Sequence, residues 1–447
     1  MANEYVPIGK LFNVQKGQLQ STKCTPGEFD FITAAEDWKT HESFEYDCEA
    51  LIFAAAASGS LGRTHYVDGK FISSDLCYIL TPKDEQAYPL NLAFYHFAFN
   101  SLRSVIVKAT KSGTSKESIN QSNFNKFELP YFDIEQQDLW ISKLKDTLVR
   151  KDLIVAELEH QQALLKKLRQ CILQDAIEGK LTVNWRLQNP NIESASKLLE
   201  YISAKKYDLI KDKKLKKGSK QESNKLENIF FEIPDSWEFP DLDDITQFVT
   251  DGTHQTPKYT KQGRIFLSAQ NVKPFNFMPE NHKFVSEEDY INYIKNKNPE
   301  KGDLLVGRVG SQGEEALIDR DIEFAFYVSL CLVKTFKTET SPEFLEIVMN
   351  SPYGNAYASG NMSSLGSSAG NFNLGRIRSF PIPFPPIAEQ LAIVAKVKSL
   401  FALCEQIEAK INSNENNAEQ LMQAVLKEAF TQSDSPLTAS IKEATYA

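Results

Sequence analysis

The sequence has 447 residues, of which 42% are hydrophobic and 24% charged, and its formal net charge is −9. This length is enough for two or three domains with cores of their own, and the composition is that of a globular protein. The net negative charge argues against a protein that coats nucleic acid, because phosphate binding needs positive potential. A subunit that works inside a larger complex escapes this objection, since its partners can supply the charge.

Cysteine usage and the N-terminus indicate the compartment. The six cysteines are scattered without a CxxC pair, which argues against zinc ribbons and disulfide frameworks and favours a reducing cytoplasm. The N-terminal MANEYVPIGK lacks the apolar core of a signal peptide, and the longest apolar run, residues 50–57, is too short to span a bilayer. We therefore expect a cytoplasmic protein without a membrane partner.

The first part of the chain mixes strand-like runs with few helices. Residues 50–58 and 75–80 look like buried strands, and residues 91–100 look helical. A long amphipathic helix without proline or interior glycine follows. Asp133 can cap this helix, with Gln136 at the capping-box position. About 40 residues of helix correspond to ~60 Å.

The second part of the chain repeats this order after a linker. A short helix is predicted at residues 194–203, followed by the Lys-rich, weakly apolar segment 205–225. Residues 302–310 and 327–336 look like strands, and residues 342–350 look helical. A second long helix then follows a double proline.

The two parts are copies of each other. PIPFPPIAEQLAIVAKV (381–397) repeats the plan of ELPYFDIEQQDLWISKL (128–144) at an offset of 253 residues, and the register holds without a gap from about residue 118 to 177. FDFITA (29–34) matches RIFLSA (264–269) at an offset of 235, so the second copy carries about 18 extra residues (253 − 235). We predict a tandem duplication of one globular unit and one long helix.

Both long helices carry an apolar stripe at steps of three and four residues, including Ile141 and Leu144 in the first and Val394 and Val397 in the second. In the second helix Glu389 complements the helix dipole. Each helix could pack on its own domain alone. Because stripe and register repeat together, we favour an antiparallel pair that holds two similar units at opposite ends.

The predicted fold class is α+β, with two tandem mixed α/β domains that are each followed by a long helix. The two helices are predicted to pair as an antiparallel coiled coil with pseudo-two-fold symmetry. The predicted segments are a first domain (1–137), a central helix (138–178), a linker (179–235), a second domain (236–389), a C-terminal helix (390–431) and a tail (432–447).

Several stretches of the chain resemble the specificity (S) subunit of type I restriction–modification systems. LRQCILQDAIEGKLTVNWR (168–186) resembles the end of the family's central helix, and NPNIESASKLLEYI followed by a Lys-rich run and FEIPDSWEF resembles its bridge into the second half. DGTHQTPKY (251–259) resembles a common opening of its target recognition domains, and PIPFPPIAEQLAIVAKV resembles its domain-to-helix junction. The first copy departs from this pattern, since LPYFDIEQQ lacks the double proline and no DGTH motif occurs.

The resemblance implies a non-catalytic subunit in which each target recognition domain reads one half of a bipartite DNA target. The paired helices would set the spacer and dock two modification (M) subunits, which are adenine-N6 methyltransferases. Two restriction (R) subunits with ATP-driven translocation and nuclease activity can join. It implies no cofactor in this chain, with S-adenosylmethionine, ATP and Mg²⁺ on the partner subunits. Readers on one face of DNA sit ~34 Å apart or a multiple of this, which a helix pair of ~60 Å can span.

Catalytic motifs are missing from the sequence. It has no P-loop, no GxGxxG after a strand, no [DN]PP[YF] of adenine methyltransferases and no HExxH. His254 beside Asp251 could suggest acid–base chemistry. We favour a turn in which Gly252 permits unusual backbone angles and the polar tips contact DNA or cap a neighbour.

Three polar segments supply candidate DNA contacts. Residues 107–123 are basic and rich in hydroxyl and amide groups, their counterpart 359–373 is small and polar, and residues 251–264 carry further cations. Arg308 could pair bidentately with guanine or a phosphate. For any single residue a solvent-exposed loop is an equally good reading. The candidates are Lys111, Ser112, Thr114, Lys116, Thr253, His254, Lys258, Arg308, Ser367 and Arg376, and no metal ligand is predicted.

Two other classes stay open at this point. One is a coiled-coil scaffold with two protein- or peptide-binding domains, which DNA binding at a split sequence would distinguish. The other is an enzyme hidden in the duplicated domain, against which the missing catalytic motifs argue. The sequence gives neither the recognised bases nor the spacer length, because readout depends on side-chain placement and DNA deformability.

Overall fold

The computed structural model describes residues 4–56, 59–112, 117–213, 215, 231–295, 297–309, 313–363 and 370–431. The chain forms two compact units. Unit 1 contains residues 1–160 and 411–447, and unit 2 contains residues 161–410. Within the described ranges, no helix is both long enough and apolar enough to cross a membrane.

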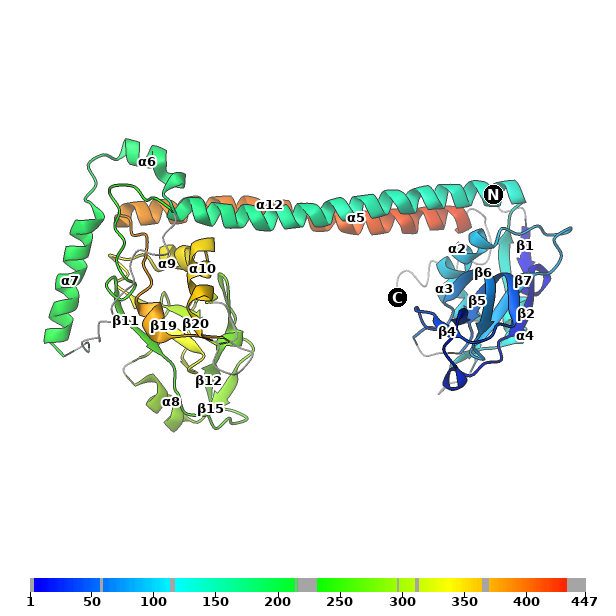
Figure 1. Ribbon diagram of the computed structural model, residues 1–447, viewed down its shortest axis with the longest axis horizontal. Helices are drawn as coiled ribbons and strands as arrows, with labels where there is room; N and C mark the ends of the chain where they lie inside the picture. Colours follow the sequence, from blue (N-terminus) through cyan, green and yellow to red (C-terminus); the bar gives the residue numbers. More distant parts are fainter. Residues whose placement is uncertain are drawn as a thin grey trace. The chain divides into compact units, whose positions relative to one another are not determined.

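The domain of unit 1 is built on one sheet. Its elements are β1 (Glu4–Pro7), α1 (Ile8–Leu11), β2 (Phe12–Lys16), η1 (Ser21–Lys23), β3 (Phe29–Ile32), β4 (Lys39–His41), β5 (Tyr46–Ala54), β6 (Thr64–Ser73), β7 (Cys77–Pro82), α2 (Leu92–Ser101), α3 (Arg103–Thr110), β8 (Lys111–Ser112), β9 (Ser118–Ile119), α4 (Gln121–Lys126) and β10 (Glu128–Tyr131). The six-stranded sheet has the order β2-β7-β5-β6-β3-β4, and only β3 and β6 pair parallel. The predicted strands and helix of this part are present, and α2 and α3 lie beside the sheet (Figure 1).

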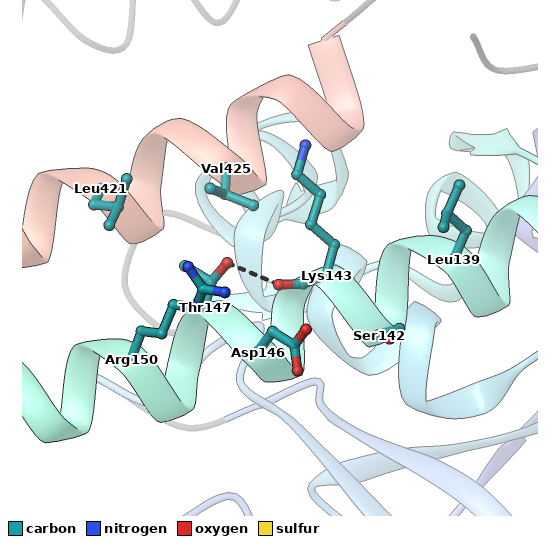
Figure 2. A pocket seen from close by; sticks show the side chains of 8 residues that line it. All are labelled: Leu139, Ser142, Lys143, Asp146, Thr147, Arg150, Leu421 and Val425. Atoms are coloured by element: carbon teal, nitrogen blue, oxygen red, sulfur yellow. Dashed lines mark hydrogen bonds between the residues drawn. The ribbon is translucent and has the colours of Figure 1, made fainter.

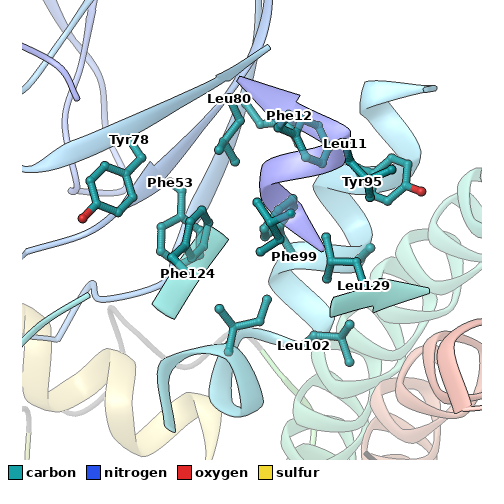
Figure 3. Packing of buried hydrophobic residues seen from close by; sticks show 14 of the residues in the cluster. Leu11, Phe12, Phe53, Tyr78, Leu80, Tyr95, Phe99, Leu102, Phe124 and Leu129 are labelled. Carbon is teal, nitrogen blue, oxygen red and sulfur yellow. The ribbon is translucent and has the colours of Figure 1, made fainter. Parts of the chain in front are cut away.

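An aromatic core fixes this sheet against its helices (Figure 3). The ring of Phe12 meets that of Phe99 edge to face at 5.8 Å, and the rings of Phe53 and Phe124 lie 4.5 Å apart. Such pairs stabilise a core by about 0.5–1.5 kcal/mol each beyond their area burial. The sheet therefore offers a firm base for the loops at its edges.

The domain of unit 2 has the same plan with additions. Its elements are β11 (Thr246–Asp251), β12 (Arg264–Leu267), η3 (Ala269–Asn271), β13 (Val272–Lys273), β14 (Asn276–Phe277), β15 (Lys283–Val285), α8 (Glu287–Ile294), β16 (Leu304–Gly307), β17 (Glu315–Leu317), β18 (Phe324–Phe326), β19 (Leu330–Thr335), α9 (Pro342–Met349), α10 (Pro352–Gly360), β20 (Met362–Ser363), β21 (Asn371–Phe372) and α11 (Leu374–Arg378). Its strands form a sheet of order β11-β19-β16-β17 and another of order β15-β12-β18.

Strand register confirms the duplication. Phe31 pairs with Ile72 in unit 1, and Phe266 pairs with Ala325 in unit 2. These partners are related by the two predicted offsets, 235 (266 − 31) and 253 (325 − 72). The extra residues of unit 2 fall between β12 and β16, where it has the β13–β14 hairpin and α8. The two domains are therefore copies of one topology with an insertion in the second.

The long helices are α5 (Ile134–Ile177) and α12 (Ile387–Thr431), and the linker contains η2 (Lys180–Thr182), α6 (Val183–Gln188) and α7 (Ala195–Lys211). As predicted, the Asp133 side chain caps α5, accepting a hydrogen bond from the Gln136 N–H at 2.9 Å. The short helix predicted at 194–203 is longer than expected and continues to Lys211.

Glu389 has a tertiary role that the dipole argument did not predict. Its buried carboxylate accepts hydrogen bonds from Thr182 Oγ1 at 2.7 Å, from Trp237 Nε1 at 2.9 Å and from the guanidinium of Arg186. These donors come from the linker and from the start of the second domain. The first turn of α12 thus holds the linker in place within unit 2.

A buried glutamine joins each long helix to its own domain. In unit 1, Gln137 Oε1 accepts from the N–H of Asn91, the N-cap of α2, at 2.7 Å. Its Nε2 donates to the carbonyls of Phe132 at 2.7 Å and Pro89 at 3.0 Å. The amide therefore fixes α5 to both α2 and the preceding turn.

The equivalent side chain of unit 2 is Gln390 (137 + 253). Its Oε1 accepts from the N–H of Ser341, the N-cap of α9, at 2.9 Å, and its Nε2 donates to the carbonyl of Pro385 at 2.9 Å. Both glutamines are fully buried. The repeated junction in the sequence thus corresponds to a repeated hydrogen-bonded joint.

The apolar stripes of both helices are buried within each unit. In unit 1, Leu144 and Val425 lie in one cluster, with Leu148 packed against it. In unit 2, the Nη2 of Arg169 donates to Oε2 of Glu408 at 2.8 Å. These contacts support the expected antiparallel pair, and the coiled-coil pairing itself stays a prediction.

Two carboxyl groups are packed together in unit 2 between β17 and α9. Glu315 is fully buried, and neither of its oxygens has a hydrogen-bond partner among the described residues. Glu346 Oε1 accepts from the Leu317 N–H at 2.9 Å. Burial raises the pKa of Glu346 to about 7, and burial together with the charge of Glu346 raises the pKa of Glu315 well above its usual range.

We expect Gln390→Leu to destabilise unit 2 by about 2–4 kcal/mol, because the buried Ser341 N–H and Pro385 carbonyl lose their partner. Urea unfolding of the purified chain measures this. Gln406→Leu, at an exposed position of the same helix, is the control. Equal unfolding midpoints for the two variants would show that the joint contributes nothing.

We also expect stability to fall as pH rises through about 7. The folded state holds protons on Glu346 and Glu315 that the unfolded chain has released, so rising pH favours unfolding. The melting temperature should be higher at pH 6 than at pH 8, and Glu346→Gln should flatten this dependence and raise the value at pH 8. Identical pH profiles of wild type and variant would contradict the assignment.

Candidate nucleic-acid interface

Three segments of unit 2 meet at the end of β16. The N–H of Arg308, just after this strand, donates to the carbonyl of Ser329 at 2.8 Å, and the Arg308 carbonyl accepts from the N–H of Phe372 at 2.8 Å. Val309 also forms a β-bridge with Asn371. The hairpin of β20 and β21 is thereby attached beside the strand end.

The buried side chain of Arg308 ties the same place to the end of β11. Its Nη1 donates to Oδ2 of Asp251 at 2.7 Å and to the carbonyl of Val328 at 3.3 Å, and its Nε donates to the carbonyl of Phe372 at 3.1 Å. We call Asp251, Gly252, Thr253, His254 and Arg308 the Arg308 corner. The geometry gives Arg308 a positioning role, and its predicted pairing with guanine or phosphate stays a prediction.

Gly252 is required by a close approach of the backbone. A Cβ atom there would lie 2.3 Å from the carbonyl oxygen of Phe326. Gly252 is not among the glycines with positive φ, so the predicted reason, an unusual backbone angle, is wrong. Only the missing side chain lets the turn pass this close to the end of β18.

In unit 1, Gly17 occupies the position that Gly252 has in unit 2. It marks the counterpart of the DGTH motif, which the sequence analysis did not find. A Cβ atom on Gly17 would lie 2.2 Å from the carbonyl oxygen of Ser74. Lys16 pairs with Tyr78 as Asp251 pairs with Cys331. The offset of 235 (252 − 17) was the available signal, but within DGTH only the glycine is shared, with Gln20 and Lys23 matching Gln255 and Lys258 further on.

The predicted residues of the segment 253–258 differ in exposure. His254 and Lys258 are exposed, and Thr253 is buried. The exposed ring of Tyr259 follows Lys258, and the Nζ of Lys283 lies 4.3 Å from the centre of this ring. Cations beside an aromatic ring in an open loop suit contacts to phosphates and bases.

Three of the other predicted residues lie in described elements, β8 and α11. Lys111 pairs with Glu117 at 2.8 Å, and Ser112 Oγ donates to the carbonyl of Ser118 at 3.5 Å. Arg376 is exposed on α11. The remaining three, Thr114, Lys116 and Ser367, lie outside the described residues. In the part of the chain that the structure describes, no cluster of three or more metal-binding side chains occurs.

A second surface feature of unit 1 is a groove of about 490 Å³ along α5 and α12 (Figure 2). Apolar Leu139, Leu421 and Val425 line it together with charged Lys143 and Arg150. Leu139 is 70% exposed. The accessible apolar side chains make this groove a candidate contact for another protein.

We expect Gly252→Ala to weaken duplex DNA binding by the assembled complex at least tenfold, because the added methyl group displaces the turn from Phe326. Gly360→Ala is the matched control, since a Cβ atom there meets nothing within 4 Å. Fluorescence anisotropy with labelled target DNA gives the affinities. Equal affinity of both variants would show that the turn does not face DNA.

A family model for the type I restriction modification DNA specificity domain matches residues 2–180 and 234–414. The chain is 23% identical over 430 residues to the type I restriction enzyme EcoDI specificity subunit of Escherichia coli, covering 95% of this chain and 87% of the relative. It is 22% identical over 442 residues to the EcoKI specificity subunit of Escherichia coli strain K12, covering 96% and 82%.

Solved structures show the same fold. The HsdS subunit from Thermoanaerobacter tengcongensis matches with a TM-score of 0.53 and 14% identity, covering 96% of both chains. A chain from a structure that describes complex assembly and conformational transition of the type I R-M system matches with a TM-score of 0.59 and 13% identity, covering 96% of this chain and 97% of that one. Because the matched segments span both units, the chain belongs to the type I restriction–modification DNA specificity family and is a DNA-binding specificity subunit with two repeated recognition domains.

Proposed function

We propose that the chain reads a bipartite DNA target, one half with the domain of each unit, and directs adenine methylation by partner subunits. The observation that carries this proposal is the duplicated domain, in which each copy has an equivalent glycine at a close backbone approach, Gly17 and Gly252. Two copies of one reading domain suit two half-targets. On this proposal the chain has no catalytic activity of its own.

The partners follow from the same proposal. Two modification subunits would dock on the paired long helices, for which the groove on α5 and α12 is a candidate contact, and two restriction subunits can join to cleave DNA. S-adenosylmethionine, ATP and Mg²⁺ would bind to those subunits. We expect the complex to act in the cytoplasm, where its DNA lies.

The proposed DNA contacts divide by unit. In unit 2 they are Thr253, His254, Lys258, Arg308 and Arg376, together with Ser367. In unit 1 they are Lys111, Ser112, Thr114 and Lys116. Lysine and arginine would supply phosphate contacts and affinity, and the hydroxyl and imidazole groups would reach base edges.

Base-resolution methylation sequencing tests the proposal. DNA from cells that express this chain with its modification subunit should carry N6-methyladenine in a two-part motif with a fixed unread spacer. Cells with the modification subunit alone should lack it. Identical methylation in both, with the modification subunit shown to be expressed, would contradict the proposal and favour the scaffold reading.

We expect Lys258→Ala to weaken binding about equally for all DNA sequences and to reduce the slope of log K against log salt by about 0.9, the value for one phosphate contact. Lys301→Ala is the control, because Lys301 is exposed and precedes β16, whereas Arg308 follows the other end of this strand. An unchanged slope in Lys258→Ala would remove this residue from the interface.

A further inference from the structure

We propose that Arg308 and Asp251 hold His254 as a base-reading side chain, whose free ring nitrogen accepts a hydrogen bond from an exocyclic amino group in the DNA major groove. This inference rests on the proposed function. It assigns one hydrogen-bond type to one side chain of unit 2, and it gives Arg308 and Asp251 the role of positioning residues for His254.

The three side chains form one connected series of hydrogen bonds. The Arg308 Nη1 lies 2.7 Å from Oδ2 of Asp251, and the His254 Nε2 lies 2.9 Å from the same oxygen. The guanidinium is itself fixed by the carbonyls of Phe372 and Val328. The backbone carbonyl of Asp251 also accepts from Lys297 Nζ at 3.0 Å. Arg308 therefore holds the carboxylate of Asp251 and Lys297 holds its backbone, so the imidazole has a fixed anchor.

The hydrogen bond to Asp251 determines which ring nitrogen of a neutral His254 carries the proton. A carboxylate only accepts hydrogen bonds, so the Nε2 that faces Asp251 must be the N–H donor. In the neutral imidazole the other nitrogen, Nδ1, is then an acceptor. The side chain of His254 is 71% exposed, so the ring is available to a DNA groove.

An acceptor at this place discriminates between bases. In the major groove, adenine N6 and cytosine N4 are amino donors, whereas guanine presents N7 and O6 and thymine presents O4, which are all acceptors. The Nδ1 of a neutral imidazole can accept a hydrogen bond from an amino group. Opposite guanine or thymine, its lone pair faces the lone pair of another acceptor, which is unfavourable. His254 should thus favour adenine or cytosine on the strand that it faces.

Unit 1 carries different chemistry at the equivalent corner. The counterparts of Asp251 and Arg308 are Lys16 (251 − 235) and Ala55 (308 − 253). The equivalence of Ala55 is visible in the backbone, since its N–H donates to Leu76 as the N–H of Arg308 donates to Ser329. Lys16 is exposed and is a donor only. The two corners therefore suit different half-targets.

The test uses the full complex with its modification subunits and a library of targets that carries each base at each position of both half-motifs. We expect His254→Leu to lower discrimination at one position of one half by about tenfold, which is the scale of a lost base contact. The other positions and the other half should be unaffected. His254→Asn, whose amide oxygen can replace Nδ1 as an acceptor, should restore most of the discrimination.

Arg308→Met tests the positioning role, because it keeps the length of the side chain and removes its donors. It should lower discrimination at the same position as His254→Leu, whereas Lys301→Ala should change nothing. If the wild type methylates a two-part motif and His254→Leu leaves the discrimination between bases unchanged, this inference is overturned and the proposed function is not. An equal loss at every position shows a structural role and also overturns it. A wild type without any two-part motif overturns the proposed function instead.

Discussion

A buried amide at the start of each long helix determines how that helix leaves its own domain. Gln137 bonds the N-cap of α2 and the carbonyl of Phe132, and Gln390 bonds the N-cap of α9 and the carbonyl of Pro385. An unpaired buried group costs about 1–3 kcal/mol, so neither helix can rotate or slide on its domain without losing these bonds. Any spacing that the helices set is therefore transmitted to the sheets and to their loops.

The two domains share this joint with their helices but differ in the side chains around Gly17 and Gly252. The backbone of the corner is the same in both, because Gly17 and Gly252 allow the same close approach. The side chains are not the same, since Lys16 stands where unit 2 has Asp251. Two copies of one fold with different side chains at equivalent positions would let one chain recognise two unlike half-targets, which agrees with the proposed function.

Much of the scaffold could be predicted from the sequence, because strand and helix periodicity and a fixed offset are local patterns. The role of Arg308 could not, since its partners Asp251 and Phe372 are 57 and 64 residues away and meet it only in the folded sheet. The corner of unit 1 was missed because Gly17 alone survives of the motif. The helix dipole explains a carboxylate in the first turn of α12, whereas the bonds of Glu389 to the linker depend on tertiary packing.

The central claim is that each domain reads its own half of the target while the helices keep the spacing. The most direct measurement replaces residues 236–389 with the corresponding segment of a specificity subunit that recognises a different sequence, and maps N6-methyladenine at base resolution. One half of the motif should change while the other half and the spacer length stay the same. A change in both halves, or in neither, would contradict it.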